Sequence, residues 1–285
     1  MTQTRTSFVS YWESVEDDVL ALAADPVAIE ESPIHTNEVS TAYSVRFRGI
    51  GGMSLFAHYS VPLGDGPFPA LLQAPGYGSV VAVPAHERRG RYAVMALSHR
   101  GQRLSDSEYA AAYPGLLTDG LPGPAEYRWR GIVADCLRAL DVLAGLPEAD
   151  SARLAVAGND LAAITAALWP RVRFLLLSGQ MLFRDTIARR GEQSAYPLEE
   201  FNDYLRSYPE SEQAVADTLS LFDPIAFAPR IEAETLVTCS TAERPSAQQF
   251  VDALSVESAL SVRTGRGYLD HKLEEDWLAK VTGAE

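Results

Sequence analysis

Cysteine and histidine are scarce in this chain of 285 residues. The two cysteines, Cys136 and Cys239, lie far apart in the sequence and lack metal-ligand spacing, so we expect two reduced thiols inside the protein. With five histidines in all, a catalytic histidine must come from a short set of candidates. No metal-spaced cluster, glycine-rich phosphate loop or nucleotide fingerprint occurs, so we expect neither a metal nor another cofactor.

Basic residues are outnumbered by acidic ones, and long apolar runs are absent from the sequence. The 24 lysines and arginines against 38 aspartates and glutamates give a formal net charge of −14, which disfavours binding to nucleic acid or an anionic membrane. No apolar stretch reaches 18 residues, and the first residues, MTQTRTSFVSYWESVEDDV, lack the apolar core of a signal peptide. We therefore expect a cytoplasmic protein that acts on a small-molecule substrate.

The chain does contain a regular succession of strand and helix patterns. Alternation with a period of two over residues 41–61 predicts an antiparallel hairpin. From Phe68 onward, short apolar runs alternate with helical spacing, which predicts a mostly parallel sheet with helices on both faces. The helical block at 183–222 interrupts this rhythm and is expected to form a cap over the sheet. We expect one α/β domain over residues 1–285.

The most informative stretch is LAVAGNDLAA, residues 154–163. An apolar strand pattern ends at Gly158, and helical spacing begins around Asp160. Strand, sharp turn and helix in this order form the nucleophile elbow, G-x-S-x-G, of α/β-hydrolases. The serine is missing, because Asp160 stands in its place and Ala162 replaces the second glycine. The pattern therefore predicts an α/β-hydrolase fold and the position of its site, and leaves the reaction open.

The other parts of such a site have candidates in the expected chain order. The main-chain N–H groups of Tyr77, in a glycine-containing loop, and of Leu161, after the elbow, are predicted to form an oxyanion hole. His271 is the histidine that follows the last predicted strand, and a helix is expected from residue 272 onward. Glu243 is the expected acid that orients this histidine, with Asp185 as the alternative.

A carboxylate at the serine position is compatible with several functions. Asp160 can act as a nucleophile whose ester is then hydrolysed by water that His271 activates, on an ester, acyl or epoxide-like bond. It can also act directly as acid or base, including in a non-hydrolytic isomerase, lyase or cyclase. A third alternative is a helix N-cap in a ligand-binding pseudoenzyme. In the predicted cap, Tyr196 and Tyr204 are candidates for substrate binding or for simple packing.

The chain resembles the acetyl xylan esterase/cephalosporin C deacetylase family over most of its length and in one register. The resemblance rests on GYG at 76–78, Arg-Gly-Gln at 100–102, the helix and strand at 130–158, and a Gly-Tyr-x-x-His segment that ends at His271. It implies an α/β-hydrolase fold, serine-dependent removal of acetyl groups from small substrates, and often a ring-like homo-oligomer. It further implies that Arg100 and Arg130 form buried ion pairs, with Asp135 as the expected partner.

The departures from the family pattern lie mainly at the elbow. The family's Gly-Gly-Ser-Gln-Gly-Gly corresponds here to GNDLAA, residues 158–163, so its serine maps to Asp160 and its glutamine to Leu161. The family's acid maps to Glu243, and its histidine is kept as His271. The sequence thus predicts a divergent member that hydrolyses a small organic molecule through Asp160, His271 and Glu243.

Overall fold

The computed structural model of this chain describes residues 7–192 and 195–284. Over these residues the core is a nine-stranded sheet with the order β1-β2-β3-β5-β4-β6-β7-β8-β9. The strands are β1 (Ala28–Glu31), β2 (Ser40–Arg48), β3 (Ser54–Pro62), β4 (Phe68–Gln73), β5 (Ala93–Ser98), β6 (Ala149–Gly158), β7 (Phe174–Ser178), β8 (Glu234–Cys239) and β9 (Ser258–Val262).

Helices occupy most of the connections between the strands. They are α1 (Phe8–Leu20), α2 (His86–Arg89), α3 (Arg128–Ala144), α4 (Asp160–Leu168), α5 (Glu199–Ser207), α6 (Glu212–Ser220), α7 (Pro224–Phe227), α8 (Arg244–Ala253) and α9 (Gly267–Thr282). Short 3-10 turns are η1 (Ile50–Gly52), η2 (Leu116–Thr118), η3 (Arg190–Glu192), η4 (Pro209–Ser211) and η5 (Ala228–Arg230).

The strand pairing confirms the predicted mixed α/β architecture. β2 pairs with β1 and β3 in antiparallel fashion, as the period of two between residues 41 and 61 indicates. β4, β5 and β6 to β9 pair in parallel. Every residue of β5 is buried, because the strand lies inside the sheet with helices over it.

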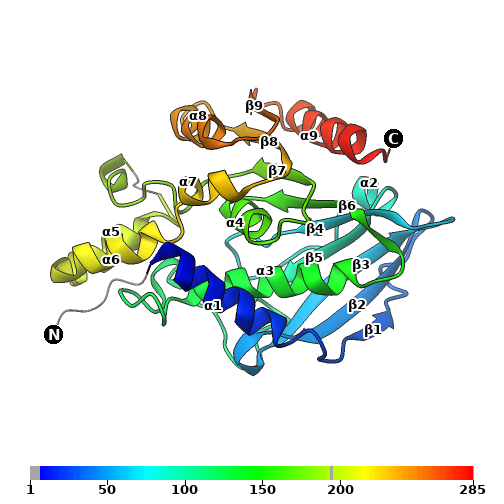
Figure 1. The fold of residues 1–285 in the computed structure, drawn as a ribbon, viewed down its shortest axis with the longest axis horizontal. Coiled ribbons are helices and arrows are strands. Elements are labelled where there is room, and N and C mark those ends of the chain that lie inside the picture. The colour runs from blue at the N-terminus through cyan, green and yellow to red at the C-terminus, as the bar shows by residue number, and fades with distance from the viewer. Residues whose placement is uncertain (1–6, 193–194, 285) are drawn as a thin grey trace.

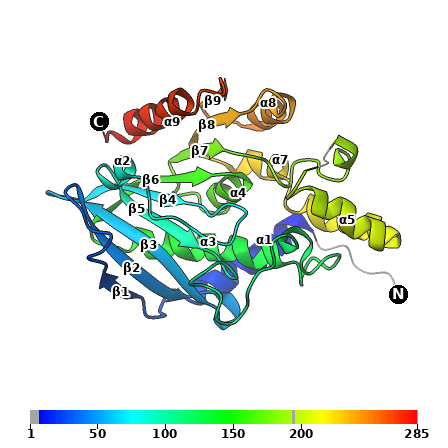
Figure 2. The same cartoon turned by 180° about the vertical axis from the view of Figure 1, so that it is seen from behind.

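Each face of the sheet has its own helical cover. Figure 1 shows α1, α3 and α4 in front of the strands, and Figure 2 shows the sheet from behind. This cover and the side chains beneath it form the main hydrophobic core, which includes Trp12 and Trp129. On the opposite face, Leu278 of α9 packs in a smaller cluster with residues such as Leu71 and Leu236. Because each face of the sheet packs against one of these hydrophobic clusters, the strands between them are apolar on both sides.

The predicted cap consists of turns followed by two helices. Of the predicted block 183–222, residues 193–194 lie outside the described part of the chain. Residues 183–192 and 195–198 contain turns and η3, whereas α5 and α6 follow and project from the end of the sheet beside the start of α1 (Figures 1 and 2). Glu200 of α5 accepts a hydrogen bond from the main-chain N–H of Leu117, at 2.8 Å. The cap is therefore anchored to the segment around η2 rather than standing free.

A buried ion pair joins the end of β5 to α3. The side chain and main-chain N–H of Arg100 make three hydrogen bonds of 2.7–2.9 Å to the carboxylate of Asp135, which is fully buried. A Cβ atom at Gly131 would collide with the Arg100 guanidinium, which explains a glycine inside this helix. The expected pair of Arg100 and Asp135 is confirmed, whereas Arg130 pairs with Asp18 on the surface of α1.

We expect the Asp135→Ala variant to lose about 3–5 kcal/mol of unfolding free energy, because it leaves the buried Arg100 without a partner. Urea denaturation followed by circular dichroism measures this loss. The matched control is Asp18→Ala, which breaks the exposed pair with Arg130 and should cost about 0–1 kcal/mol. Equal losses in the two variants would contradict a structural role for the buried pair.

Candidate active site

The elbow is present as a strand, a sharp turn and a helix. β6 ends at Gly158, whose φ of 155° lies outside the usual range of side-chain-bearing residues, and a Cβ atom there would meet Ala74 at 3.0 Å. Asn159 then caps α4, since its Oδ1 accepts a hydrogen bond from the N–H of Leu161 at 3.2 Å. This turn sets Asp160 at the first position of the helix.

Asp160 is completely buried at the start of α4. Its Oδ2 accepts a hydrogen bond from the main-chain N–H of Phe183 at 2.7 Å, whereas its Oδ1 has no hydrogen-bond partner. Burial raises the pKa of this carboxyl group to about 7, although the main-chain N–H groups of Phe183 and Leu182 oppose the shift. Near neutral pH the group therefore exists in both its protonated and its ionised form.

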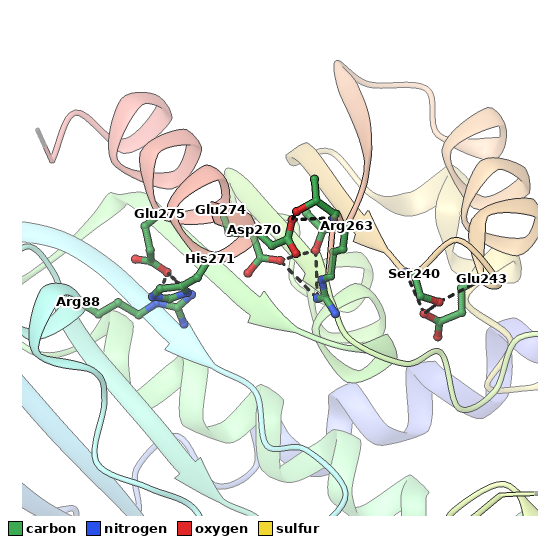
Figure 3. Close-up of polar contacts among 10 residues, drawn as sticks. Arg88, Ser240, Glu243, Arg263, Asp270, His271, Glu274 and Glu275 are labelled. Carbon is green, nitrogen blue, oxygen red and sulfur yellow. Dashed lines mark hydrogen bonds and ion pairs between the residues drawn. The ribbon is translucent and has the colours of Figure 1, made fainter. Parts of the chain in front are cut away.

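His271 lies within α9, and its side chain is 48% exposed. The predicted helix start at residue 272 is wrong, because α9 begins at Gly267 and takes His271 into its first turns. Its Nδ1 is 4.0 Å from Oε1 of Glu275, one turn further along, and that carboxylate pairs with Arg88 of α2 at 2.6 Å. Figure 3 shows His271 in this group. Over residues 7–192 and 195–284, no hydrogen bond or ion pair joins it to Asp160.

The two candidate acids do not contact His271 either. Oε2 of Glu243 accepts hydrogen bonds from the N–H and the hydroxyl of Ser240, at 3.2 and 2.8 Å, and so closes its own turn before α8. Figure 3 shows this pair apart from the His271 group. Asp185 is exposed beside Arg184 and has a positive φ of 50°. The structure thus does not bring the predicted nucleophile, base and acid into mutual contact.

The two residues predicted to form the oxyanion hole lie at the start of α4 and in the loop after β4. The N–H of Leu161 is engaged by Asn159, as described above. The loop that carries Tyr77 is held by Gln102, whose side-chain amide donates hydrogen bonds to the carbonyl groups of Gly76 and Gly78, at 3.2 and 2.7 Å. The Arg-Gly-Gln segment therefore supports this loop, a role that the sequence alone did not indicate.

The predicted cap tyrosines line a surface pocket of about 310 Å³. Tyr196 is 58% exposed and its hydroxyl donates to Asp203 at 2.5 Å, whereas the hydroxyl of Tyr204 donates to the carbonyl of Leu121 at 3.0 Å. Glu200 also lines this pocket and accepts a hydrogen bond from the hydroxyl of Tyr77. Sequence reasoning missed Glu200, for which the acidic and tyrosine-rich composition of the cap was the available signal.

Three further observations concern metal binding, membrane-spanning helices and the cysteines. Within the part of the chain that the structure describes, no group of three or more histidine, cysteine, aspartate or glutamate side chains is arranged to hold a metal ion. None of the described helices combines the length and apolarity needed to cross a bilayer. Cys136 and Cys239 are both buried free thiols.

The raised pKa of Asp160 predicts a pH dependence of stability. Between about pH 4 and 7 the folded state keeps a proton that the unfolded state has lost, so the unfolding free energy should fall as pH rises. We expect Asp160→Asn to escape this loss and to become more stable than wild type by about 4 kcal/mol above pH 7. Urea denaturation at several pH values measures the difference.

The matched control for this experiment is Asp150→Asn. A hydrogen bond from Arg153 lowers the pKa of Asp150, so its contribution is present at neutral pH and is lost as pH falls. The two variants should therefore show opposite trends with pH. A stability difference for Asp160→Asn that does not change between pH 4 and 8 would mean that this carboxyl group titrates normally.

Comparison with known proteins begins with the solved structures. Acetyl xylan esterase 1 from Thermoanaerobacterium sp. JW/SL YS485 superposes with a TM-score of 0.82 at 22% identity, over 97% of this chain and 95% of that one. The acetyl xylan esterase from Paenibacillus sp. R4 gives a TM-score of 0.82 at 24% identity, over 98% and 96% of the two chains. At these identities the likeness shows that the fold is that of an α/β-hydrolase.

Sequence comparison extends this likeness to the family. Acetyl esterase Axe7A of Xylanibacter ruminicola is 23% identical over 257 residues, which are 83% of this chain and 56% of that protein. The chain thus spans about half the length of this curated relative. The sequence model of the acetyl xylan esterase family, AXE1, matches residues 2–250. This chain therefore belongs to the acetyl xylan esterase (AXE1) family of hydrolases.

Proposed function

We propose that this chain hydrolyses a small ester at the elbow, with Asp160 as the reacting carboxylate. The observation that carries the proposal is the buried Oδ1 of Asp160, which has no hydrogen-bond partner and belongs to a group with a pKa of about 7. A buried polar atom without a partner is costly, and such groups are characteristic of sites that work on a ligand. Family membership supports ester hydrolysis as the reaction.

Direct base catalysis fits the geometry better than nucleophilic attack. A carboxylate with a pKa near 7 can accept a proton from water at neutral pH. Its nucleophilic use would need a separate base for the second step, and the candidate His271 is engaged beside Glu275 instead. In the proposed reaction, Asp160 takes a proton from water as the water oxygen bonds to the ester carbonyl carbon. The bond to the alcohol oxygen then breaks, and Asp160 returns the proton to that oxygen.

The proposed reaction requires two local movements. Asp160 is fully buried, so the segment around Phe183 has to withdraw before water and an ester can reach the carboxylate. The N–H of Leu161 has to leave Asn159 before it can donate, together with the N–H of Tyr77, to the oxygen of the tetrahedral intermediate.

A ligand-binding protein without hydrolysis, or a non-hydrolytic enzyme that uses Asp160 as acid or base, is the second candidate. The observation that favours it is that the candidate catalytic groups already form local hydrogen bonds, and so are not free to act on a substrate. These bonds run from Phe183 to Asp160, from Leu161 to Asn159 and from Ser240 to Glu243. In a binding protein, Asp160 would only complement the positive end of α4. Turnover of a simple ester separates these functions.

We expect kcat/KM for p-nitrophenyl acetate to rise with pH and to level off above about pH 7, because the ionised form of Asp160 is the active one. Asp160→Asn should lower kcat/KM by about 10²–10⁴-fold. The control His271→Ala should stay close to wild type, since direct base catalysis does not use this side chain. Unchanged hydrolysis by Asp160→Asn would refute the assignment of the site.

Single turnover in water enriched in oxygen-18 distinguishes the two roles of Asp160. Direct base catalysis puts the label into the released acid and leaves the Asp160 carboxylate unlabelled. Attack by Asp160 on the carbonyl carbon would instead expel the alcohol and form an acyl-aspartyl anhydride. Water that adds to the aspartyl carbon of this anhydride leaves label in the Asp160 carboxylate, and added hydroxylamine traps the anhydride as a hydroxamate of Asp160. Mass spectrometry of the peptide that contains Asp160 reads the outcome, and label or a hydroxamate there would refute direct base catalysis and make Asp160 the nucleophile.

A further inference from the structure

The cap pocket is the surface pocket of about 310 Å³ between α5 and the segment before and within η2. Its lining includes Thr118 from η2 and Tyr196, Glu200, Asp203 and Tyr204 from the cap. This volume is at the small end of the range for sites that bind small molecules. The lining combines aromatic rings with carboxylates and contains no lysine or arginine.

Glu200 is a buried carboxyl group that forms no ion pair with a cation of the described chain. Glu200 as a whole is only 4% exposed to solvent. Its oxygens accept hydrogen bonds from the hydroxyl of Tyr77 and the N–H of Leu117, and over residues 7–192 and 195–284 no arginine or lysine forms an ion pair with it. Buried carboxylates are normally paired with a cation, because neutral donors leave their charge uncompensated.

The aromatic side chains around Glu200 favour the same kind of ligand. Tyr196 and Tyr204 line the pocket, and the rings of Tyr77 and Tyr113 pack edge to face at 5.2 Å beside Glu200. The face of a tyrosine ring is electronegative and attracts ammonium groups, most strongly where water is partly excluded. The net charge of −14 adds a long-range attraction for cations.

Asp203 adds less to this attraction than Glu200. Its carboxylate is exposed and already paired with Arg206, and it accepts the hydroxyl of Tyr196. The charge of Asp203 is therefore largely compensated within the cap. The uncompensated charge in the pocket belongs to Glu200.

We propose that the cap pocket binds an alkylammonium group, with Glu200 supplying the charge and the lining tyrosines the ring faces. Tyr77 links this pocket to the elbow, because the same residue belongs to the predicted oxyanion loop and bonds to Glu200. An ester that carries an ammonium group is then the substrate class of the site. The substrate class rests on the esterase function proposed above, whereas the cation site itself does not.

Calorimetric titration with choline and with 3,3-dimethylbutanol, its neutral isostere, tests the cation site. We expect choline to bind about tenfold more tightly than the isostere, and Glu200→Gln to remove that preference. Tyr196→Leu, at an exposed ring, should weaken choline binding without affecting the fold. Glu210→Gln is the control, because Glu210 is an exposed glutamate of the cap that does not line the pocket. Equal affinity for both compounds, or an undiminished preference in Glu200→Gln, would overturn the proposal.

Hydrolysis of acetylcholine and of 3,3-dimethylbutyl acetate tests the substrate class. We expect kcat/KM to favour acetylcholine by about tenfold in the wild type and by much less in Glu200→Gln. Equal values for the two esters in the wild type would refute the substrate class.

The two proposals fail in distinguishable ways. Choline binding in a protein that hydrolyses no ester would uphold the cation site and refute the esterase function. Hydrolysis of p-nitrophenyl acetate that depends on Asp160, without choline binding, would uphold the esterase function and refute the cation site.

Discussion

The buried ion pair between Arg100 and Asp135 is the contact on which the geometry of the site depends. It fixes the end of β5 to α3, and two residues later Gln102 holds the carbonyl groups of the loop that carries Tyr77. Tyr77 in turn bonds to Glu200 of the cap. One continuous series of polar contacts thus runs from the core to the cap. A substitution at Arg100 or Asp135 would therefore alter the cap pocket, because each group in the series has few other hydrogen-bond partners in a closely packed interior.

Asp160 shows what happens when a carboxyl group is buried at the start of a helix with no cation of the described chain beside it. A serine there would be neutral, whereas the aspartate must either keep its proton or carry a charge in a buried position. The main-chain N–H of Phe183 stabilises the ionised form, and burial opposes it more strongly. The result is a group balanced between its two forms near neutral pH, which is the property expected of an acid-base catalyst.

The features that could be predicted from the sequence are those that periodicity controls. The hairpin, the parallel sheet and the elbow follow from patterns of two and of about 3.6 residues, and they agree with the structure. The position of His271 could not be predicted in this way. Chain order places it after the last strand, but the early start of α9 and the buried carboxylate of Glu275 determine where its side chain lies. The composition of the cap pointed to acidic residues there, but the burial of Glu200 could not be predicted, because it depends on Leu117 and Tyr77, which are far away in the sequence.

The excess of carboxylates also bears on how a reaction at this site would end. Hydrolysis of an ester releases an alcohol and a carboxylic acid, and the acid ionises at neutral pH. The anion would form beside the carboxyl group of Asp160, on a protein whose net charge is −14. Like charges repel most strongly where water is scarce, so the acid product would be expelled as it forms. The same negative field that draws a cation into the cap pocket would therefore keep the site free of its own anionic product.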